Sequence, residues 1–208
     1  MLLVVFALPA EARVFQRRLR HQRKHETYFD GIMGGTRVGI CFVGIRATAI
    51  ADFETAIQQL APTLVISSGF AGATRALLEP GDFLIASNYT TAHLEIPGSS
   101  LVDATGPFCS VEQINGPLEK RRLGESGVAV DMESKAIAAV CDRYQIPLIT
   151  ARMISDGRDE SIPAVFLDGK LQSTKDAIVA GRFAFRMLRL TRLLAERLTW
   201  LISNPAKD

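Results

Sequence analysis

The sequence predicts a single α/β domain, a three-layer α/β/α sandwich in which helices cover both faces of a mixed β-sheet. Runs that are apolar almost throughout alternate with segments of helical spacing, which is typical of strands buried on both faces. Two strand-like runs, 26–33 and 36–43, meet at a Gly34-Gly35 turn, so we expect one antiparallel pair in the sheet. A chain of 208 residues suits one well-buried domain, 1–208, rather than two.

The first elements follow from an apolar start and one helical segment. Residues 2–7 have the hydrophobicity of a signal peptide, but no basic residue precedes them, and Glu11 and Arg13 follow at once. We therefore predict a buried strand, then a helix from residue 10 to about residue 20 that ends in a basic surface segment. The spacing after the hairpin predicts a second helix over residues 47–60, which Pro62 ends.

The later elements alternate in the same way around one irregular region. Residues 63–68, 83–87 and 147–154 are expected strands, and a loop of small residues over 69–73 follows the first of them. Residues 88–127 are rich in Gly, Pro, Ser and Thr and are predicted to be irregular, with a solvated loop at 119–122. Apolar residues at spacings of three and four predict a helix over 131–145, and a last helix begins near Ser173 or Thr174.

Composition excludes several classes of protein. A formal net charge of +2 provides no basis for binding nucleic acid, and no run of about 18 apolar residues predicts a membrane span. Three widely spaced cysteines without a CxxC motif fit a reducing cytoplasm. His21 and His25 stand four apart but have no evident third ligand, so we predict no metal site.

Two acidic motifs carry the chemistry. Glu133 lies in Val130-Asp131-Met132-Glu133-Ser134, and Asp156 follows 23 positions later, at the end of the next expected strand. The intervening helix and strand could bring both carboxylates to one end of the sheet. Paired carboxylates suit reactions through a cationic sugar, because one acid protonates the leaving group and the other stabilises positive charge.

The order of these signals resembles the nucleoside phosphorylase and nucleosidase superfamily, whose members cleave the N-ribosidic bond of nucleosides. The matching signals are Glu11, Gly44, Ser68-Gly69-Phe70-Ala71-Gly72, Asp131-Met132-Glu133 and Ser155-Asp156. Within the superfamily the chain is similar to methylthioadenosine/S-adenosylhomocysteine nucleosidases and to hopanoid-associated phosphorylases. The resemblance implies a small-molecule nucleoside substrate, an adenine leaving group, no cofactor and a homo-oligomer.

The resemblance also implies roles for single residues. Asp156 would protonate or hydrogen-bond the purine N7, and its apolar neighbours are expected to favour its protonated form. Ser155 would position Asp156. Glu133 would hold the ribose hydroxyls with Met132 packed against the sugar, and Glu11 would orient an attacking water.

Further positions match the rest of the nucleoside site. Gln113 and Ile114 stand where relatives bind the base through the backbone, and the loop of Gly69, Phe70, Ala71 and Gly72 would approach the ribose. The chain between residues 87 and 111 is shorter than in typical relatives. This compression affects the pocket for the 5′ substituent and the usual dimer contact.

Two acceptors for the sugar stay open. Phe70 stands where many relatives place a phosphate-contacting Ser, and Glu11 is present, so we favour water slightly. Arg46, just after Gly44, could instead bind phosphate as a co-substrate in a phosphorylase, because guanidinium suits phosphate geometry. A catalytically silent purine-binding sensor is the alternative of another class.

The last helix has an apolar stripe at spacings of three and four, flanked by arginines. The stripe consists of Phe183, Met187, Leu190, Leu194, Leu198 and Leu201. We expect this helix to cover the sheet or to form an oligomer contact. A basic amphipathic helix can also lie on an anionic membrane, which we regard as the lesser alternative.

Overall fold

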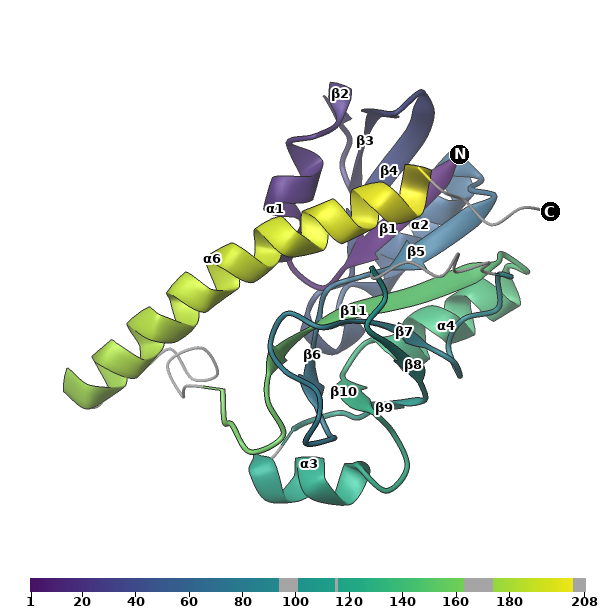
Figure 1. Ribbon diagram of the computed structural model, residues 1–208. Helices are drawn as coiled ribbons and strands as arrows, with labels where there is room; N and C mark the ends of the chain where they lie inside the picture. The colour runs from purple at the N-terminus through teal and green to yellow at the C-terminus, as the bar shows by residue number, and fades with distance from the viewer. Residues whose placement is uncertain (94–100, 115, 163–173, 204–208) are drawn as a thin grey trace.

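The computed structural model describes residues 1–93, 101–114, 116–162 and 174–203 (Figure 1). Its strands are β1 (Leu2–Phe6), β2 (Arg20–Lys24), β3 (Tyr28–Met33), β4 (Thr36–Phe42), β5 (Leu64–Ser67), β6 (Phe70–Ala73), β7 (Phe83–Ala86), β8 (Ala104–Gly106), β9 (Phe108–Ser110), β10 (Ala129–Asp131) and β11 (Leu148–Asp156). Its helices are α1 (Pro9–Gln16), the 3₁₀ turn η1 (Ile45–Ala47), α2 (Ile50–Leu60), α3 (Pro117–Leu123), α4 (Ser134–Arg143) and α6 (Thr174–Ser203).

The sheet is mixed, with strand order β2-β3-β4-β1-β5-β11-β6-β10-β9. Strand β1 runs parallel to both β4 and β5, whereas β3 and β4 form the antiparallel hairpin that the Gly34-Gly35 turn predicts. Strand β11 is buried along its whole length and pairs first with β5 and β7, then with β6. Because β11 ends at Asp156, the sheet itself carries this residue to its edge.

Helices cover both faces of the sheet, so the three-layer expectation is confirmed. Helices α1 and α6 pack against each other on one face, where α6 crosses in front of the sheet (Figure 1). Helices α2 and α4 lie over a separate buried cluster on the other face. Leu190, Leu194, Leu198 and Leu201 are buried in the first cluster, so the C-terminal half of the apolar stripe covers the sheet as expected.

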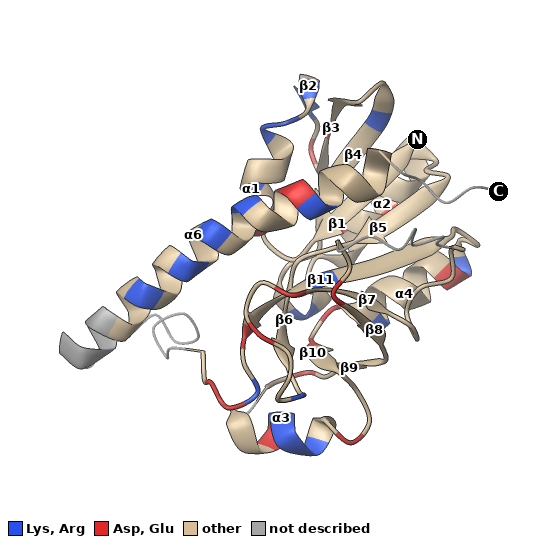
Figure 2. Ribbon diagram, in the orientation of Figure 1, with Lys and Arg blue, Asp and Glu red and all other residues tan. Residues whose placement is uncertain are grey.

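The N-terminal part of α6 extends beyond the sheet (Figure 1), and basic residues recur along it (Figure 2). Arg182, Arg189 and Arg192 are exposed on it, together with Phe185 and Leu188. Contact between this surface and a membrane or another copy of the chain stays a prediction. Among the described helices, none has a stretch long and apolar enough to cross a bilayer.

Two segments have a different secondary structure from the one we predicted. The first helix ends at Gln16, and the basic segment after it is β2, an edge strand whose side chains are all exposed. Its backbone pairing with β3 forms the strand, and a polar edge strand has no apolar alternation to reveal it. The expected loop 69–73 is largely strand β6, where small residues fit between β10 and β11.

The region 88–127 contains more structure than expected. Two short strands, β8 and β9, and helix α3 lie in its described part. The expected solvated loop at 119–122 is wrong, because these residues lie in α3 and Lys120 is only 1% exposed. The helix predicted from Asp131 begins at Ser134, since Asp131 ends β10 and Glu133 occupies the N-cap.

Candidate active site

Four elements bring acidic and basic side chains together at one end of the sheet. Glu11 lies in the first turn of α1, directly after β1, and Glu133 precedes α4. Arg152 and Asp156 both belong to the second half of β11. Strand β6 pairs with this half of β11 and lies between it and β10.

A small cavity joins three of these groups. Glu11, Ser68, Glu133 and Arg152 line it, together with Ala7, Gly69, Phe70 and Ile137. The space in it that is open to the centre of a water molecule is about 10 Å³, which is about what one buried water needs. Two carboxylates and one guanidinium supply more polar partners than a single buried water needs.

The backbone at the end of β1 holds Glu11 in place. The N–H groups of Ala7 and Leu8 donate to Glu11 Oε2 at 3.1 and 3.2 Å. Gly69 has a φ of 145°, and a Cβ added there would lie 3.1 Å from the same oxygen, so a glycine is needed for this approach. Burial raises the pKa of Glu11 to about 7, against smaller lowering effects of the Leu8 N–H and of Arg152.

Glu133, at the N-cap of α4, lines the same cavity. The backbone N–H of Arg46 donates to Glu133 Oε1 at 2.9 Å, and Arg46 adopts a left-handed φ of 58°. Burial raises the pKa of Glu133, while the Arg46 N–H and the positive charge of Arg152 lower it. Glu133 is thus a fixed carboxylate next to a cation, with one oxygen directed to the backbone.

Arg152 is the residue of the cavity that sequence reasoning missed. It is 2% exposed and donates to Asp131 Oδ2 at 3.0 Å, to Ser67 Oγ at 3.0 Å and to Ser134 Oγ at 3.1 Å. A charged residue inside the apolar run 147–154 was the available signal, because a buried charge is retained only with partners.

Ser68 lines the cavity with an uncommitted hydroxyl. The residue is 2% exposed, and within the described part of the chain its Oγ has no hydrogen-bond partner. Buried hydroxyls in folded proteins are rarely unpaired, so this oxygen is available to a partner that the described residues do not supply. A water in the cavity would be such a partner.

Asp156 lies apart from this cavity and is 1% exposed. Ser155 Oγ donates to Asp156 Oδ1 at 2.5 Å, and the Lys120 ammonium donates to Asp156 Oδ2. The prediction for Asp156 considered only its apolar neighbours in the sequence, whereas a helix from the 88–127 region places a buried cation against it. No sequence period marks Lys120, which stands in a run of four charged residues.

The segment 69–72 connects the two acidic groups. A Cβ added to Gly72 would lie 3.2 Å from Asp156 Oδ2, just as one on Gly69 would approach Glu11. Three residues of extended chain span about 10 Å, so the carboxyl groups of Glu11 and Asp156 are separated by roughly this distance. Phe70 lines the cavity and Ala71 is buried in β6.

The remaining predicted residues lie outside the described contacts of the cavity. Met132 is half-buried, Gln113 is exposed and Ile114 is half-buried before α3. The side chain of Arg46 is exposed, and Gly44 has a φ of 72° and a position where an added Cβ would collide with Thr48 Oγ1. Their roles in binding base or phosphate stay predictions.

A larger hollow of about 370 Å³ lies at the beginning of β11 and the end of α4. Cys141, Gln145 and Leu148 are among its lining residues, and none of the acidic residues above reaches it. We assign the chemistry to the smaller cavity, because that is where buried charges converge. The described residues contain no cluster of His, Cys, Asp and Glu suited to a metal ion.

Comparisons of sequence and fold show which known proteins this chain is similar to. A family model described as the phosphorylase superfamily matches residues 2–100 and 101–180. The 5′-methylthioadenosine/S-adenosylhomocysteine nucleosidase of Staphylococcus epidermidis is 24% identical over 218 residues, which cover 84% of this chain and 96% of the relative. The enzyme of the same name from Haemophilus influenzae is 30% identical over 167 residues, or 63% of this chain and 73% of the relative.

Solved structures share the fold over nearly the whole chain. The 5′-methylthioadenosine/S-adenosylhomocysteine nucleosidase of Campylobacter jejuni has a TM-score of 0.74 at 16% identity, covering 98% of this chain and 99% of its own. A futalosine hydrolase mutant of Helicobacter pylori has a TM-score of 0.73 at 18% identity, with 98% and 99% covered. The fold is therefore common to these proteins from end to end.

Proposed function

The chain belongs to the phosphorylase superfamily, and we propose that it hydrolyses the N-glycosidic bond of a 5′-substituted adenine nucleoside. Water is the acceptor of the sugar in this proposal. The observation that carries it is the cavity between Glu11 and Glu133, in which about 10 Å³ is open to the centre of a water molecule, enough for one water to sit between the two carboxyl groups.

Glu11 is the base that activates this water. A general base must be ionised, and its efficiency is highest when its pKa lies near the working pH. The pKa of Glu11 is raised to about 7 by burial, and two backbone N–H groups fix the carboxylate before substrate arrives. Ser68 Oγ supplies a further contact to the water from β5 and its following loop.

Glu133 and Arg152 complete the sugar side of the site. As the glycosidic bond breaks, the ribose gains positive charge, which a preorganised carboxylate stabilises. The Arg46 N–H holds Glu133 from one side, and Arg152 keeps a positive charge near both carboxylates. Arg152 and the backbone N–H groups thereby offset part of the effect of burial, which raises the pKa of both Glu11 and Glu133.

Asp156 acts on the leaving base. A purine anion is a poor leaving group, so a proton or strong hydrogen bond to its imidazole ring is worth ~10²–10⁴ in rate. Asp156 lies at the end of β11. It is near Gly72, whereas Glu11 is near Gly69 at the other end of segment 69–72, and Ser155 donates to one of the Asp156 oxygens. We assign the purine N7 to this carboxyl.

The relatives support an adenine nucleoside with a 5′ substituent as the substrate class. Proteins from S. epidermidis and H. influenzae that match this chain carry the name 5′-methylthioadenosine/S-adenosylhomocysteine nucleosidase. Phosphate remains the competing acceptor in a phosphorylase. The exposed side chain of Arg46 and the presence of Phe70 beside the cavity favour water over a phosphate bound there.

Release of free adenine from 5′-methylthioadenosine and from adenosine tests the proposal, with and without inorganic phosphate. We expect equal turnover in both conditions and faster turnover of the 5′-substituted nucleoside. Strict dependence on phosphate would establish phosphorolysis instead. Saturable binding of adenine without any base release would identify a purine-binding sensor and refute an enzymatic role.

A further inference from the structure

Lys120 is a buried lysine whose charge is directed at Asp156. Its side chain is 1% exposed, although both flanking residues on α3, Glu119 and Arg121, reach the surface or its margin. The ammonium donates to Asp156 Oδ2, to the carbonyl of Gly157 at 2.9 Å and to the carbonyl of Glu160 at 2.8 Å. Lysine is rarely buried in this way unless it is paired.

The three contacts suit a protonated amine. An ammonium has three N–H donors and no acceptor, whereas a neutral amine has two donors and a lone pair. Lys120 Nζ contacts three oxygen atoms, so an ammonium can direct one N–H to each of them. One of these N–H groups would then lie on the line to Asp156 Oδ2, where a proton can move between the two side chains.

Asp156 still has room for a substrate contact. A carboxylate offers about four lone-pair positions, and Ser155 and Lys120 occupy one each. Gly72 makes this pairing sterically feasible, because an added Cβ would lie 3.2 Å from both Asp156 Oδ2 and Lys120 Cε. A purine nitrogen that contacts the carboxyl would therefore not have to displace Lys120.

The other charges near the pair come from two elements. On α6, Arg186 donates to the carboxylate of Glu160 at 2.6 and 3.2 Å and to the carbonyl of Ser155 at 3.4 Å. Glu160, in the loop after β11, thereby has its own cation. The Lys120–Asp156 pair is left as the buried charge pair next to the site of the leaving base.

We propose that Lys120 is a positioning residue that stores the proton destined for the purine and delivers it through Asp156. This role rests on the proposed hydrolysis of a nucleoside. When the bond from C1′ to N9 breaks, its electron pair moves to the purine, Asp156 passes a proton to N7, and Lys120 passes its own proton to Asp156. The attacking water forms the new C1′–O bond and gives a proton to Glu11. Solvent then takes the proton from Glu11 and restores one to Lys120, so no proton is consumed.

The pH profile of the single-turnover rate of adenine release tests this role. In the wild type the rate should hold up to about pH 9, because Asp156 draws its proton from Lys120 and not from solvent. In Lys120→Met, Asp156 must take its proton from solvent, which becomes harder as the pH rises. We expect a loss of ~10²-fold or more at about pH 9 and of less than ~10-fold at about pH 5.5, with binding of adenine retained.

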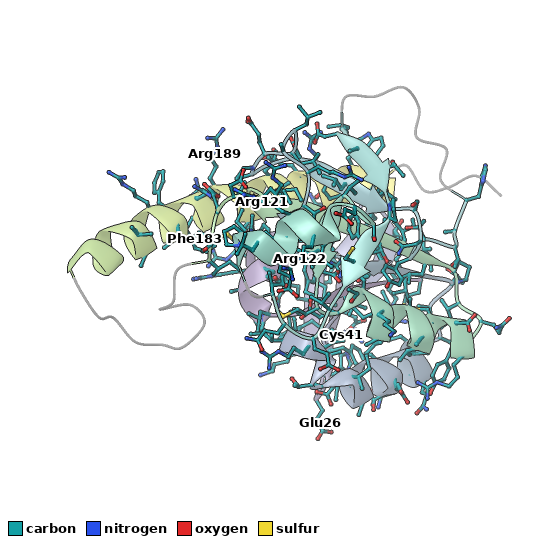
Figure 3. All side chains as sticks on the ribbon, turned by 90° about the horizontal axis from the view of Figure 1, so that it is seen from below. Glu26, Cys41, Arg121, Arg122, Phe183 and Arg189 are labelled. Carbon is teal, nitrogen blue, oxygen red and sulfur yellow. The ribbon has the colours of Figure 1, made fainter. Side chains whose placement is uncertain are left out.

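Two further variants separate proton storage from charge or packing. Lys120→Arg keeps the charge, but guanidinium does not give up its proton, so it should not restore the rate at alkaline pH. Arg122→Met is the matched control, because Arg122 is an exposed residue of the same helix and its loss should leave the profile unchanged (Figure 3). Thermal unfolding and adenine binding establish that each variant is folded.

The outcomes distinguish the two proposals. If the wild type is active, the role of Lys120 alone is overturned by either of two results. One is a Lys120→Met rate that is lowered equally at every pH, and the other is an alkaline rate that Lys120→Arg restores. If Lys120→Met does not fold, a wild-type rate that already falls between about pH 6 and pH 8 overturns it equally well. A wild type that releases no adenine with water or phosphate overturns the proposed function and this role together.

Discussion

Replacement of Glu11 by Gln should stabilise the protein at alkaline pH while removing hydrolysis. Burial raises the pKa of Glu11 from 4.5 to about 7, which corresponds to about 3 kcal/mol at ~1.4 kcal/mol per pKa unit. Because the folded state holds this proton more tightly than the unfolded state, the contribution of Glu11 to stability is fully present below about pH 4.5. It is lost as the pH rises through about 7.

Gln cannot ionise, so the variant does not undergo this loss. Urea unfolding at about pH 4.5 should therefore give similar free energies of unfolding for wild type and Glu11→Gln, and at about pH 8 the variant should be more stable by up to about 3 kcal/mol. The rate of adenine release should fall ~10²–10⁴-fold, because no base activates the water. Glu26→Gln, at an exposed position (Figure 3), is the control for both measurements.

A constant difference in stability across this pH range would refute the argument from burial. In the wild type, the same reasoning predicts that the rate of hydrolysis rises as the pH increases through about 7, because Glu11 must be ionised to act. A rate that is already maximal near pH 5 would show that Glu11 titrates as an ordinary surface carboxyl or is not the base.

Three other predictions follow from single contacts. Asp156→Asn should lower adenine release ~10²–10⁴-fold at every pH without a loss of folding, as measured by circular dichroism; near-normal rates would exclude Asp156 as the acid. Arg152→Met should destabilise the fold by about 3–5 kcal/mol in urea unfolding, because it leaves Asp131 buried without its cation, and an unchanged midpoint would contradict the pairing. Leu198→Ala should cost about 2–5 kcal/mol, since Leu198 of α6 is fully buried against the sheet, and a smaller effect would place this helix off the sheet.

Much of the fold could be predicted from hydrophobic patterning. Residues 2–6 and 148–154 of the expected strands 2–7 and 147–154 are buried in the structure, and the Gly34-Gly35 turn forms the expected hairpin. Strand β2 could not be found in this way, because every side chain on it is exposed and only backbone pairing defines it. The pattern of apolar residues reports burial of side chains, and it therefore misses strands that bury none.

The sequence placed the acids near the ends of strands, but it did not predict which of them meet or where their counterions lie. Glu133 and Asp156 were expected at one end of the sheet, whereas Glu133 lines the cavity with Glu11 and Asp156 lies apart from it. Arg152 and Lys120 are buried cations whose partners lie far away in the sequence. Spacing along the chain does not predict such pairs, since the fold alone decides which charges meet.

The central claim is that one water between Glu11 and Glu133 attacks the sugar, and its most direct test is the source of the oxygen on the released ribose. A single turnover of 5′-methylthioadenosine in water labelled with heavy oxygen, with phosphate present, is analysed by mass spectrometry. We predict one labelled oxygen in the sugar product and no sugar phosphate in the wild type, with neither product formed by Glu11→Gln. A ribose 1-phosphate carrying unlabelled oxygen would contradict the account.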